Sequence, residues 1–255
     1  MTSSHPAWPW PALIAHRGGG RLAPENTLAA MRTGVARGFH MAEYDVKLSQ
    51  DGVPFLLHDD RIDRTCDGQG LASELDWKDL ARFDFGAWKG PNFAGEPAPT
   101  LLSIARYTLA NGMHSNIEIK PTTGVEHDTG LAVAQAAAQL WAAAPLPPLL
   151  SSFSETALEA ARTAAPDLPR ALLIEGPVPS DWRARMNGLG CIGLNIDTRH
   201  ADQAVVRDIL DQGATLSVWT VNDLDRAREL LAWGCQAIFT DALDLLSADT
   251  LAPSR

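Results

Sequence analysis

Short apolar runs recur along the chain, and stretches of helical length with one apolar face separate most of them. This alternation is typical of βαβ units and a parallel sheet. The runs predict strands at Leu13–Arg17, Met41–Leu48, Asn116–Lys120, Leu149–Phe153, Arg170–Glu175, Cys191–Ile196, Thr215–Thr220 and Ala237–Thr240. About eight such units without a GxGxxG turn favour closure into a single (β/α)8 TIM barrel over an open, doubly wound sheet.

The intervening helices have recognisable ends. Ser154 and Asn222 each stand before a helical stretch, where a side chain that accepts backbone hydrogen bonds is favoured. Gly213 and Gly234 follow two helix ends, where glycine readily closes the last turn. The helix expected over Asp202–Gln212 places its apolar side chains on one face, as a helix packed on a sheet does: Val205, Val206, Ile209 and Leu210.

One stretch interrupts this alternation. Between Asp59 and Thr100 the chain is rich in Gly, Pro, Asp and aromatic residues and is too long for a simple βα loop. We expect one domain over residues 1–255, with residues of about 60–100 forming a small inserted subdomain after the second strand. Such an insertion belongs at the mouth of the barrel, where the carboxyl ends of the strands meet and substrate pockets form.

Composition narrows the class of protein. The 255 residues are 45% hydrophobic and 20% charged, as in an ordinary globular domain. No window offers the roughly 20 apolar residues of a membrane span. Residues 1–11 lack the basic and apolar regions of a signal peptide, so we expect a cytoplasmic location. Cys66, Cys191 and Cys235 have no CxxC spacing and are expected to be inert thiols.

The net charge is −10 and the pI is near 5.1. This overall charge repels polyanions, so we expect no nucleic acid as a partner, and binding to an anionic membrane would have to overcome an unfavourable field. Any phosphate that the protein binds must therefore be met by a local site.

Candidate metal ligands lie on two of the predicted strands. Glu43 and Asp45 are two positions apart in an apolar strand, so their side chains share a face, and Glu118 and Lys120 repeat this spacing. Unpaired carboxylates on a dry strand are costly and repel one another, so a positive charge is expected between them. Three carboxylates with water suit one divalent cation, Mg2+ or Ca2+, with Mn2+ as a further option. The alternative is a metal-free ion-pair network in which Lys120 balances the acids.

Two histidines stand at the ends of strands. His16 ends the first, and His58 ends a run that we expect to pair as a hairpin with the second strand across residues 50–52. Phosphodiester cleavage needs one group to take a proton from the attacking oxygen and another to protonate the leaving oxygen, and histidine suits both tasks. We assign this pair to proton transfer rather than to metal binding, although either residue alone could be structural.

Other residues suggest how a substrate is held. Arg17 offers a planar fork to phosphate oxygens and, with Lys120, would neutralise charge in the transition state. The flat face of Trp219 could pack on a carbon skeleton such as glycerol, or it could serve barrel packing. Residues 18–20 are glycines that allow a close approach of the backbone to a ligand, or that simply form a turn.

From residue 16 to about residue 241 the chain resembles the glycerophosphodiester phosphodiesterases of the bacterial cytoplasmic type. The resemblance lies in the order and spacing of HRGGGRLAPENTLAAM, AEYDVKLSQDGVPFLLHDDRIDRTCDGQG, NIEIKP, SVWTVN and IFTD. It implies a TIM barrel that hydrolyses diesters such as glycerophosphocholine or glycerophosphoethanolamine to glycerol 3-phosphate and an alcohol. The glycerol 2-hydroxyl would attack first and give a cyclic phosphate.

The resemblance also implies roles for single residues. The metal ligands would be Glu43, Asp45 and Glu118, the acid and base would be His16 and His58, and the substrate contacts would be Arg17, Lys120 and Trp219. Glu25 is expected near the metal, and Asn26 is expected to tie the first loop to the following helix, both in supporting roles.

The chain departs from the family pattern at Ala42, at Cys66 and after the PTL segment, which lacks an acidic residue. These departures put the substrate preference in question rather than the activity. One alternative is a barrel phosphodiesterase for lysophospholipids or phosphoinositides, for which the aromatic stretch Phe83–Phe93 could supply an apolar rim. Another is a non-catalytic protein that binds glycerophosphodiesters. The barrel could also form a homodimer.

Overall fold

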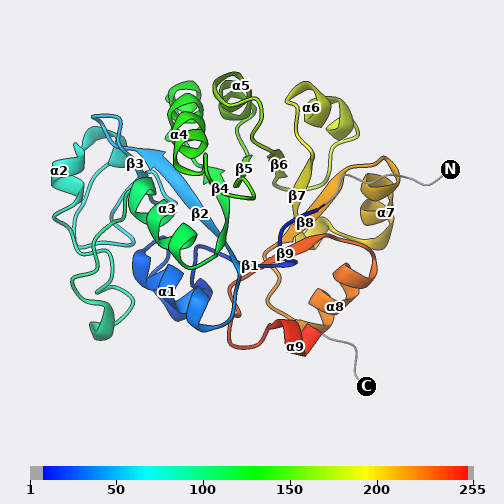
Figure 1. Ribbon diagram of the computed structural model, residues 1–255, viewed down its shortest axis with the longest axis horizontal. Helices are drawn as coiled ribbons and strands as arrows, with labels where there is room; N and C mark the ends of the chain where they lie inside the picture. The colour runs from blue at the N-terminus through cyan, green and yellow to red at the C-terminus, as the bar shows by residue number, and fades with distance from the viewer. Residues whose placement is uncertain (1–7, 252–255) are drawn as a thin grey trace.

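The computed structural model describes residues 8–251 and shows helices arranged around a ring of strands (Figure 1). Residues 1–7, part of the segment interpreted as lacking a signal peptide, lie outside the described residues. The strands are β1 (Leu13–Ala15), β2 (Met41–Leu48), β3 (Pro54–Leu56), β4 (His114–Ile119), β5 (Leu149–Ser152), β6 (Arg170–Ile174), β7 (Gly193–Asp197), β8 (Thr215–Trp219) and β9 (Ala237–Thr240). The α-helices are α1 (Leu28–Ala36), α2 (Trp77–Leu80), α3 (Leu101–Ala110), α4 (Glu126–Leu140), α5 (Glu155–Ala164), α6 (Trp182–Gly188), α7 (Gln203–Asp211), α8 (Leu224–Ala232) and α9 (Ala248–Leu251). Short 3-10 helices are η1 (Gly20–Leu22), η2 (Ala72–Glu74), η3 (Pro91–Phe93) and η4 (Thr198–His200).

The parallel strands close into a barrel, which confirms the predicted TIM-barrel fold. In the described chain the strands pair in the order β1, β2, β4 and then β5 to β9, and β9 pairs with β1. The strand β3 runs antiparallel to the last residues of β2, with Val46 opposite Leu56. The hairpin predicted before His58 is therefore confirmed.

Side chains alternate between two apolar layers along the strands. Ala42, Tyr44 and Val46 of β2 are buried against helices in the outer layer. Met41, on the opposite face of the same strand, joins an inner cluster whose members come from strands around the ring, among them Ile14 and Phe239. Residues further along β2 on the inner face therefore lie above an apolar floor, at the end of the barrel where the strands finish.

Two local expectations were wrong. The first strand ends at Ala15 rather than Arg17, because Arg17 adopts a left-handed backbone conformation with φ of 49°. The helix expected after Asn222 is instead capped by Asp223, whose side chain accepts a hydrogen bond from the Arg226 amide. The side chain of Asn222 accepts one from the Asp241 amide and so ties the loop before α8 to the end of β9.

Other helix ends lie where the sequence places them. Ser154 caps α5 by accepting a hydrogen bond from the Ala157 amide. Gly213 and Gly234 follow α7 and α8 with φ of 82° and 105°.

Residues 60–100 follow β3 and contain η2, α2 and η3, at the left of Figure 1. Their apolar side chains pack with β3 in a separate small cluster that contains Phe55, Leu57, Ile62, Ala72, Leu80, Phe85 and Ala98. The Asp84 carboxylate accepts hydrogen bonds from three backbone amides of the segment. Glu96 accepts one from the Ala29 amide, which fastens the segment to the first turn of α1.

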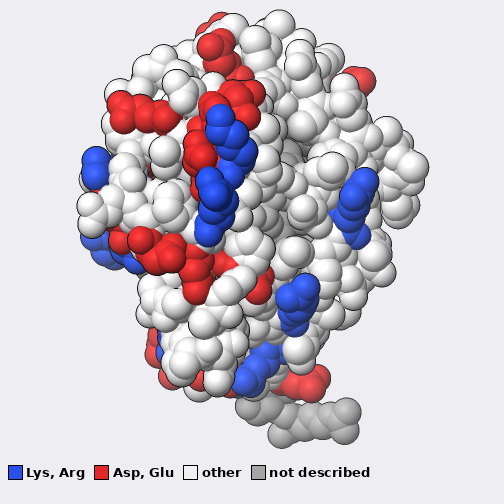
Figure 2. All heavy atoms as spheres, turned by 90° about the vertical axis from the view of Figure 1, so that its left-hand side faces the viewer, with Lys and Arg blue, Asp and Glu red and all other residues white. Residues whose placement is uncertain are grey.

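No helix within residues 8–251 combines the length and apolar character needed to cross a membrane. The face that carries α2 shows basic and acidic side chains in adjacent patches rather than one broad area of a single sign (Figure 2).

Candidate active site

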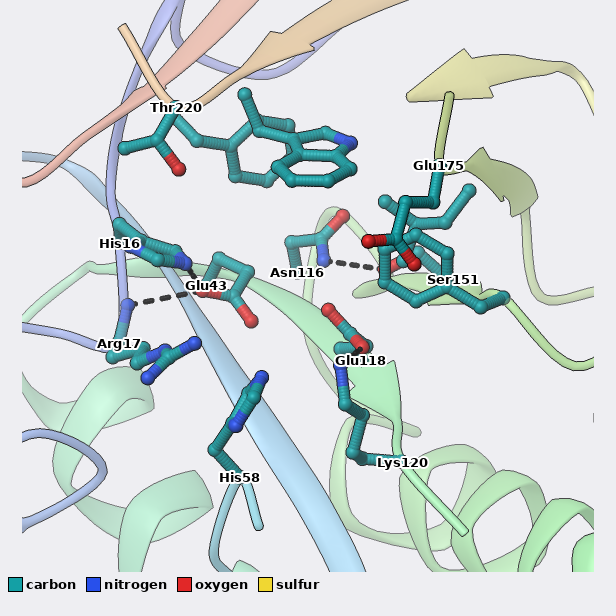
Figure 3. A pocket seen from close by; sticks show the side chains of 14 residues that line it. His16, Arg17, Glu43, His58, Asn116, Glu118, Lys120, Ser151, Glu175 and Thr220 are labelled. Atoms are coloured by element: carbon teal, nitrogen blue, oxygen red, sulfur yellow. Dashed lines mark hydrogen bonds and ion pairs between the residues drawn. The ribbon is translucent and has the colours of Figure 1, made fainter. Parts of the chain in front are cut away.

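A cavity of about 440 Å³ lies where the strands of the barrel finish. It is lined by most of the predicted site residues, namely His16, Arg17, Glu43, His58, Glu118, Lys120 and Trp219. The remaining one, Asp45, lies in the acidic cluster beside them. In Figure 3 the side chains of His16, Glu43, His58, Glu118 and Lys120 converge on one space from β2, β4 and the loops after β1 and β3.

Three carboxylates meet at the edge of this cavity. One oxygen of each of Glu43, Asp45 and Glu118 lies within 4.8 Å of the others, because the parallel register sets Asp45 beside Glu118 and the strand alternation puts Glu43 on the same face. The Arg17 amide donates to Glu43 Oε2 at 3.0 Å. Asn26 Nδ2 donates to Asp45 Oδ2 at 2.8 Å.

Burial sets the proton affinity of this cluster. Burial, together with the negative charge of Asp45, raises the pKa of Glu43 to about 8 and that of Glu118 to about 7. Burial alone would also raise the pKa of Asp45, but the charges of Arg17, His58 and Lys120 outweigh it and lower that pKa. Both glutamates therefore hold a proton more readily than a solvated carboxyl group does, and a cation bound between them would favour their ionised forms.

The residues present fit a divalent cation. Glu43 Oε1 is buried and has no hydrogen-bond partner among the described residues, although a buried carboxylate oxygen normally has one. Three carboxylates within ligand distance form the oxygen-only donor set that hard cations prefer. Lys120 Nζ donates to Glu118 Oε1 at 2.7 Å, so it balances part of the charge but leaves Glu43 Oε1 unpaired.

Asn26 and Glu25, the two residues expected in supporting roles, contact Asp45 and Arg17 respectively. Asn26 does not tie the first loop to the next helix through its side chain. It binds Asp45 at both ends of its amide, since Oδ1 also accepts from the Asp45 backbone amide at 3.0 Å. Glu25 accepts hydrogen bonds from Arg17 and Arg64, so it orients the phosphate-binding candidate Arg17 rather than the acidic cluster.

His16 is held by a residue that sequence reasoning missed. Its Nδ1 lies 2.7 Å from Asp241 Oδ1, at the end of β9, and its Nε2 lies 3.9 Å from Glu43 Oε2. Burial lowers the pKa of His16, but the bond to Asp241 and the charge of Glu43 outweigh burial and raise it. Asp241 directly follows the last strand, at the rim where the other strands also end. This position in the sequence could have marked it as a site residue.

His58 occupies a different electrostatic environment. Its Nδ1 lies 2.6 Å from Asp59 Oδ1, and Asp59 is also held by Arg64. Burial lowers the pKa of His58, the charge of Asp45 opposes this, and the charges of Arg17 and Lys120 add to the lowering. One histidine therefore favours its protonated form and the other its neutral form.

Two cations are fixed beside the acids. Arg17 is partly buried, and the charges of Asp45 and Glu25 outweigh its burial and raise its pKa. For Lys120, the charges of Glu118 and Asp45 do the same. The fully buried Lys47, also missed from the sequence, donates from Nζ to the Lys120 carbonyl at 2.9 Å and so joins β2 to the end of β4.

The far wall of the cavity is aromatic. Trp219 packs edge-on against Phe153, with ring centroids 5.6 Å apart, and its Nε1 donates to the Asn195 carbonyl. Lys120 Nζ lies 4.8 Å from the centroid of Phe153. Glu175 borders the same cavity and adds a carboxylate that could accept hydroxyl hydrogen bonds. The cavity thus offers apolar faces and a polar group opposite the acidic cluster.

Known proteins are similar to this chain in sequence and in fold. The family model described as the glycerophosphoryl diester phosphodiesterase family matches residues 16–245. The Bacillus subtilis protein YhdW, provisionally named a glycerophosphodiester phosphodiesterase, is 30% identical over 241 residues, which cover 93% of this chain and 97% of that protein. A glycerophosphodiester phosphodiesterase of Caldanaerobacter subterraneus is 28% identical over 233 residues, covering 90% and 93%.

Solved structures give the same result. An Oleispira antarctica phosphodiesterase, determined in complex with the product sn-glycerol-3-phosphate, matches with a TM-score of 0.86 at 36% identity, over 91% of this chain and 94% of that one. A glycerophosphodiester phosphodiesterase of Agrobacterium tumefaciens shares the fold, with a TM-score of 0.75 at 24% identity over 91% and 96%. The chain therefore belongs to the glycerophosphoryl diester phosphodiesterase family.

Proposed function

We propose that this protein hydrolyses small glycerophosphodiesters to glycerol 3-phosphate and the free alcohol with the help of one divalent cation. The observation that carries the proposal is a cavity lined by two histidines, each paired with an aspartate, with a cluster of three carboxylates at its edge. Membership of the family supports it, as does the likeness to a phosphodiesterase solved with sn-glycerol-3-phosphate.

Glu43, Asp45 and Glu118 would hold the cation, which we propose to be Mg2+ or Ca2+, with Mn2+ as a further candidate. When bound, it supplies positive charge to the phosphate oxygens. Asn26 keeps Asp45 oriented, and the Arg17 amide does the same for Glu43. These fixed ligands need little rearrangement on binding.

The histidines would transfer protons at the two ends of the reaction. One removes a proton from the attacking oxygen, either of water or of the glycerol 2-hydroxyl, and the other protonates the leaving oxygen. Because each Nδ1 is bonded to an aspartate, Nε2 is the nitrogen left to each ring for this work. Arg17 and Lys120 would bind the phosphate oxygens as charge develops on them, and Trp219 would pack on the glycerol carbons.

The test is release of glycerol 3-phosphate from purified protein, with glycerophosphocholine, glycerophosphoethanolamine and glycerophosphoglycerol as substrates and Mg2+, Ca2+ or Mn2+ added. We expect release that EDTA abolishes and that the cation restores. Full activity in excess EDTA would remove the cation from the mechanism. Binding of the diesters without any release would favour a non-catalytic binding protein.

The lysophospholipid alternative makes a different prediction. An acyl chain needs a continuous apolar surface beside the site, and the exposed large apolar side chains of the described residues are Trp88, Leu102, Leu109, Val125 and Leu245. Of these, Trp88 alone lines a cavity next to the site. Preference for lysophosphatidylcholine over glycerophosphocholine would overturn the proposed substrate class.

Three expectations about the whole protein remain predictions. These are a single domain over residues 1–255 with an insertion at about 60–100, a homodimer, and a cytoplasmic location.

A further inference from the structure

A second cavity, of about 470 Å³, adjoins the first. The two share His16 and Arg17, whereas His58, Glu118 and Trp219 line the first cavity alone. The other walls of the second cavity include Arg21 of η1 and three side chains from residues 60–100, namely Arg64, Trp88 and Lys89. The two cavities therefore meet at a residue expected to contact the phosphate, Arg17, and at one expected to transfer a proton, His16.

A phosphodiester has two arms on one phosphorus, and a site that meets the phosphate between two cavities can direct one arm into each. The first cavity offers the aromatic wall around Trp219 that suits the glycerol carbons. The second cavity would then hold the leaving alcohol. This step rests on the function proposed above.

Most charged side chains around the second cavity are already paired, including its two acids, Glu25 and Asp241, which are bonded to arginines and to His16 respectively. Arg21 forms a two-pronged pair with Asp244, and Arg64 is bonded to Glu25 and Asp59. Lys89 differs from them. In the part of the chain that the structure describes, no carboxylate lies within 4.0 Å of its Nζ, although this lysine is only partly exposed.

Lys89 is also placed over an aromatic ring. Its Nζ lies 5.6 Å from the centroid of Trp88, and the indole is held in place because Trp88 Nε1 donates to the Phe85 carbonyl at 2.9 Å. A quaternary ammonium would seek the face of this tryptophan. It would meet the charge of Lys89 there, so the lysine disfavours a cationic alcohol and attracts an anionic one.

We propose that the second cavity is a leaving-group subsite that selects alcohols carrying a negative charge, such as a polyol that bears a further phosphate, over cationic alcohols such as choline. Lys89 is its unpaired cation, and Trp88 is the surface on which the carbon skeleton of the alcohol packs.

Three diesters with the same glycerol arm test this proposal: glycerophosphocholine, glycerophosphoglycerol, and glycerophosphoglycerol extended by a second glycerophosphate. We expect kcat/KM to rise in that order. The increase from the neutral to the anionic leaving alcohol should be about fivefold and should become smaller at high salt. Lys89→Gln should remove most of this increase, and Lys89→Glu should reverse it. The matched control is Lys78→Gln, which alters an exposed lysine of the same segment that pairs with Asp76 and lines neither cavity.

Equal kcat/KM for the three diesters, a preference for choline, or a Lys89→Gln variant that keeps the wild-type ratio would overturn the subsite and leave the proposed function standing. Absence of hydrolysis with every diester would overturn both together.

Discussion

The two histidines face the same cavity, but their aspartates come from opposite ends of the chain. Asp59 is the next residue after His58, whereas Asp241 lies at the end of β9 and reaches His16 across the closure of the barrel. Each aspartate fixes one ring nitrogen and leaves the other for chemistry, as an orienting carboxylate does for a catalytic histidine.

Replacing His16 or His58 by Ala should lower turnover about 100-fold or more, because general acid or base catalysis contributes at least that much. The measurement is the rate of glycerol 3-phosphate release at saturating substrate, with circular dichroism to confirm the fold. His127→Ala, at an exposed position of α4, serves as the control and should retain wild-type turnover. Wild-type rates in both site variants would remove the histidines from the mechanism.

Asp241→Asn tests a positioning role. An amide in place of the carboxylate can present its NH2 group to Nδ1 of His16 and no longer stabilises the protonated ring, so we expect kcat to fall about 10- to 100-fold with a smaller change in KM. The limb of the pH–rate profile that depends on His16 should also move to lower pH, because Asp241 helps to raise the pKa of His16. Asp249→Asn, on the exposed helix α9, should change neither. An unchanged pH profile in Asp241→Asn would refute the role.

At the scale of elements, α4 and α5 pack in close contact at Gly130. A Cβ at Gly130 would lie 2.3 Å from the Ala157 carbonyl oxygen, so this glycine lets the two helices touch. Gly188, at the end of α6, has no atom within 4 Å of a Cβ. Gly130→Ala should therefore lower the free energy of unfolding by about 1–3 kcal/mol through overpacking. Gly188→Ala should raise it by about 0.5–1 kcal/mol. Denaturant titration of both variants measures the difference, and equal signs would contradict the packing argument.

The sequence predicts the elements better than their ends. Period-two alternation identified β2 and β4 and put Glu43, Asp45 and Glu118 on one face, because that argument needs only neighbouring residues. It extended the first strand to Arg17, where the bond from the Arg17 amide to Glu43 accompanies a left-handed turn that no local pattern shows.

The missed residues depend on contacts between distant elements. Lys47 and Asp241 act on partners 73 and 225 positions away in the sequence. Asn222 resembles a helix cap, but its side chain is used by the Asp241 amide, and Asp223 takes over the capping role. Residues of this kind become visible only once the order of strands around the barrel is known.

At the scale of the whole molecule, the acidic cluster couples stability to pH and to the cation. The pKa values of Glu43 and Glu118 are about 8 and about 7 in the folded protein, against 4.5 for an ordinary glutamate. The folded protein therefore binds these protons more tightly than the unfolded chain does. The contribution of these two protons to the free energy of unfolding is complete below pH 4.5, and it is lost as the pH rises through about 7 and about 8. His16 acts in the same direction and His58 in the opposite one.

We expect the Tm of the metal-free protein to fall between about pH 6 and about pH 9, and added Mg2+ or Ca2+ to raise the Tm more at the higher pH, because the cation binds the deprotonated acids. Thermal melts with EDTA or with the cation test this. Glu43→Gln should raise the metal-free Tm at high pH and abolish most of the response to the cation. A cation response that does not vary with pH in the wild-type protein would contradict the coupling.

The pairing of the first strand with the last has a consequence for the timing of activity during synthesis. A ribosome finishes His16 early and Asp241 almost at the end, so a growing chain carries the ring long before its carboxylate partner exists. Chains that lack the last strand cannot pair β1 with β9 and leave His16 without Asp241. The site can therefore become complete only after the last strand has been synthesised, and we expect no full activity before then.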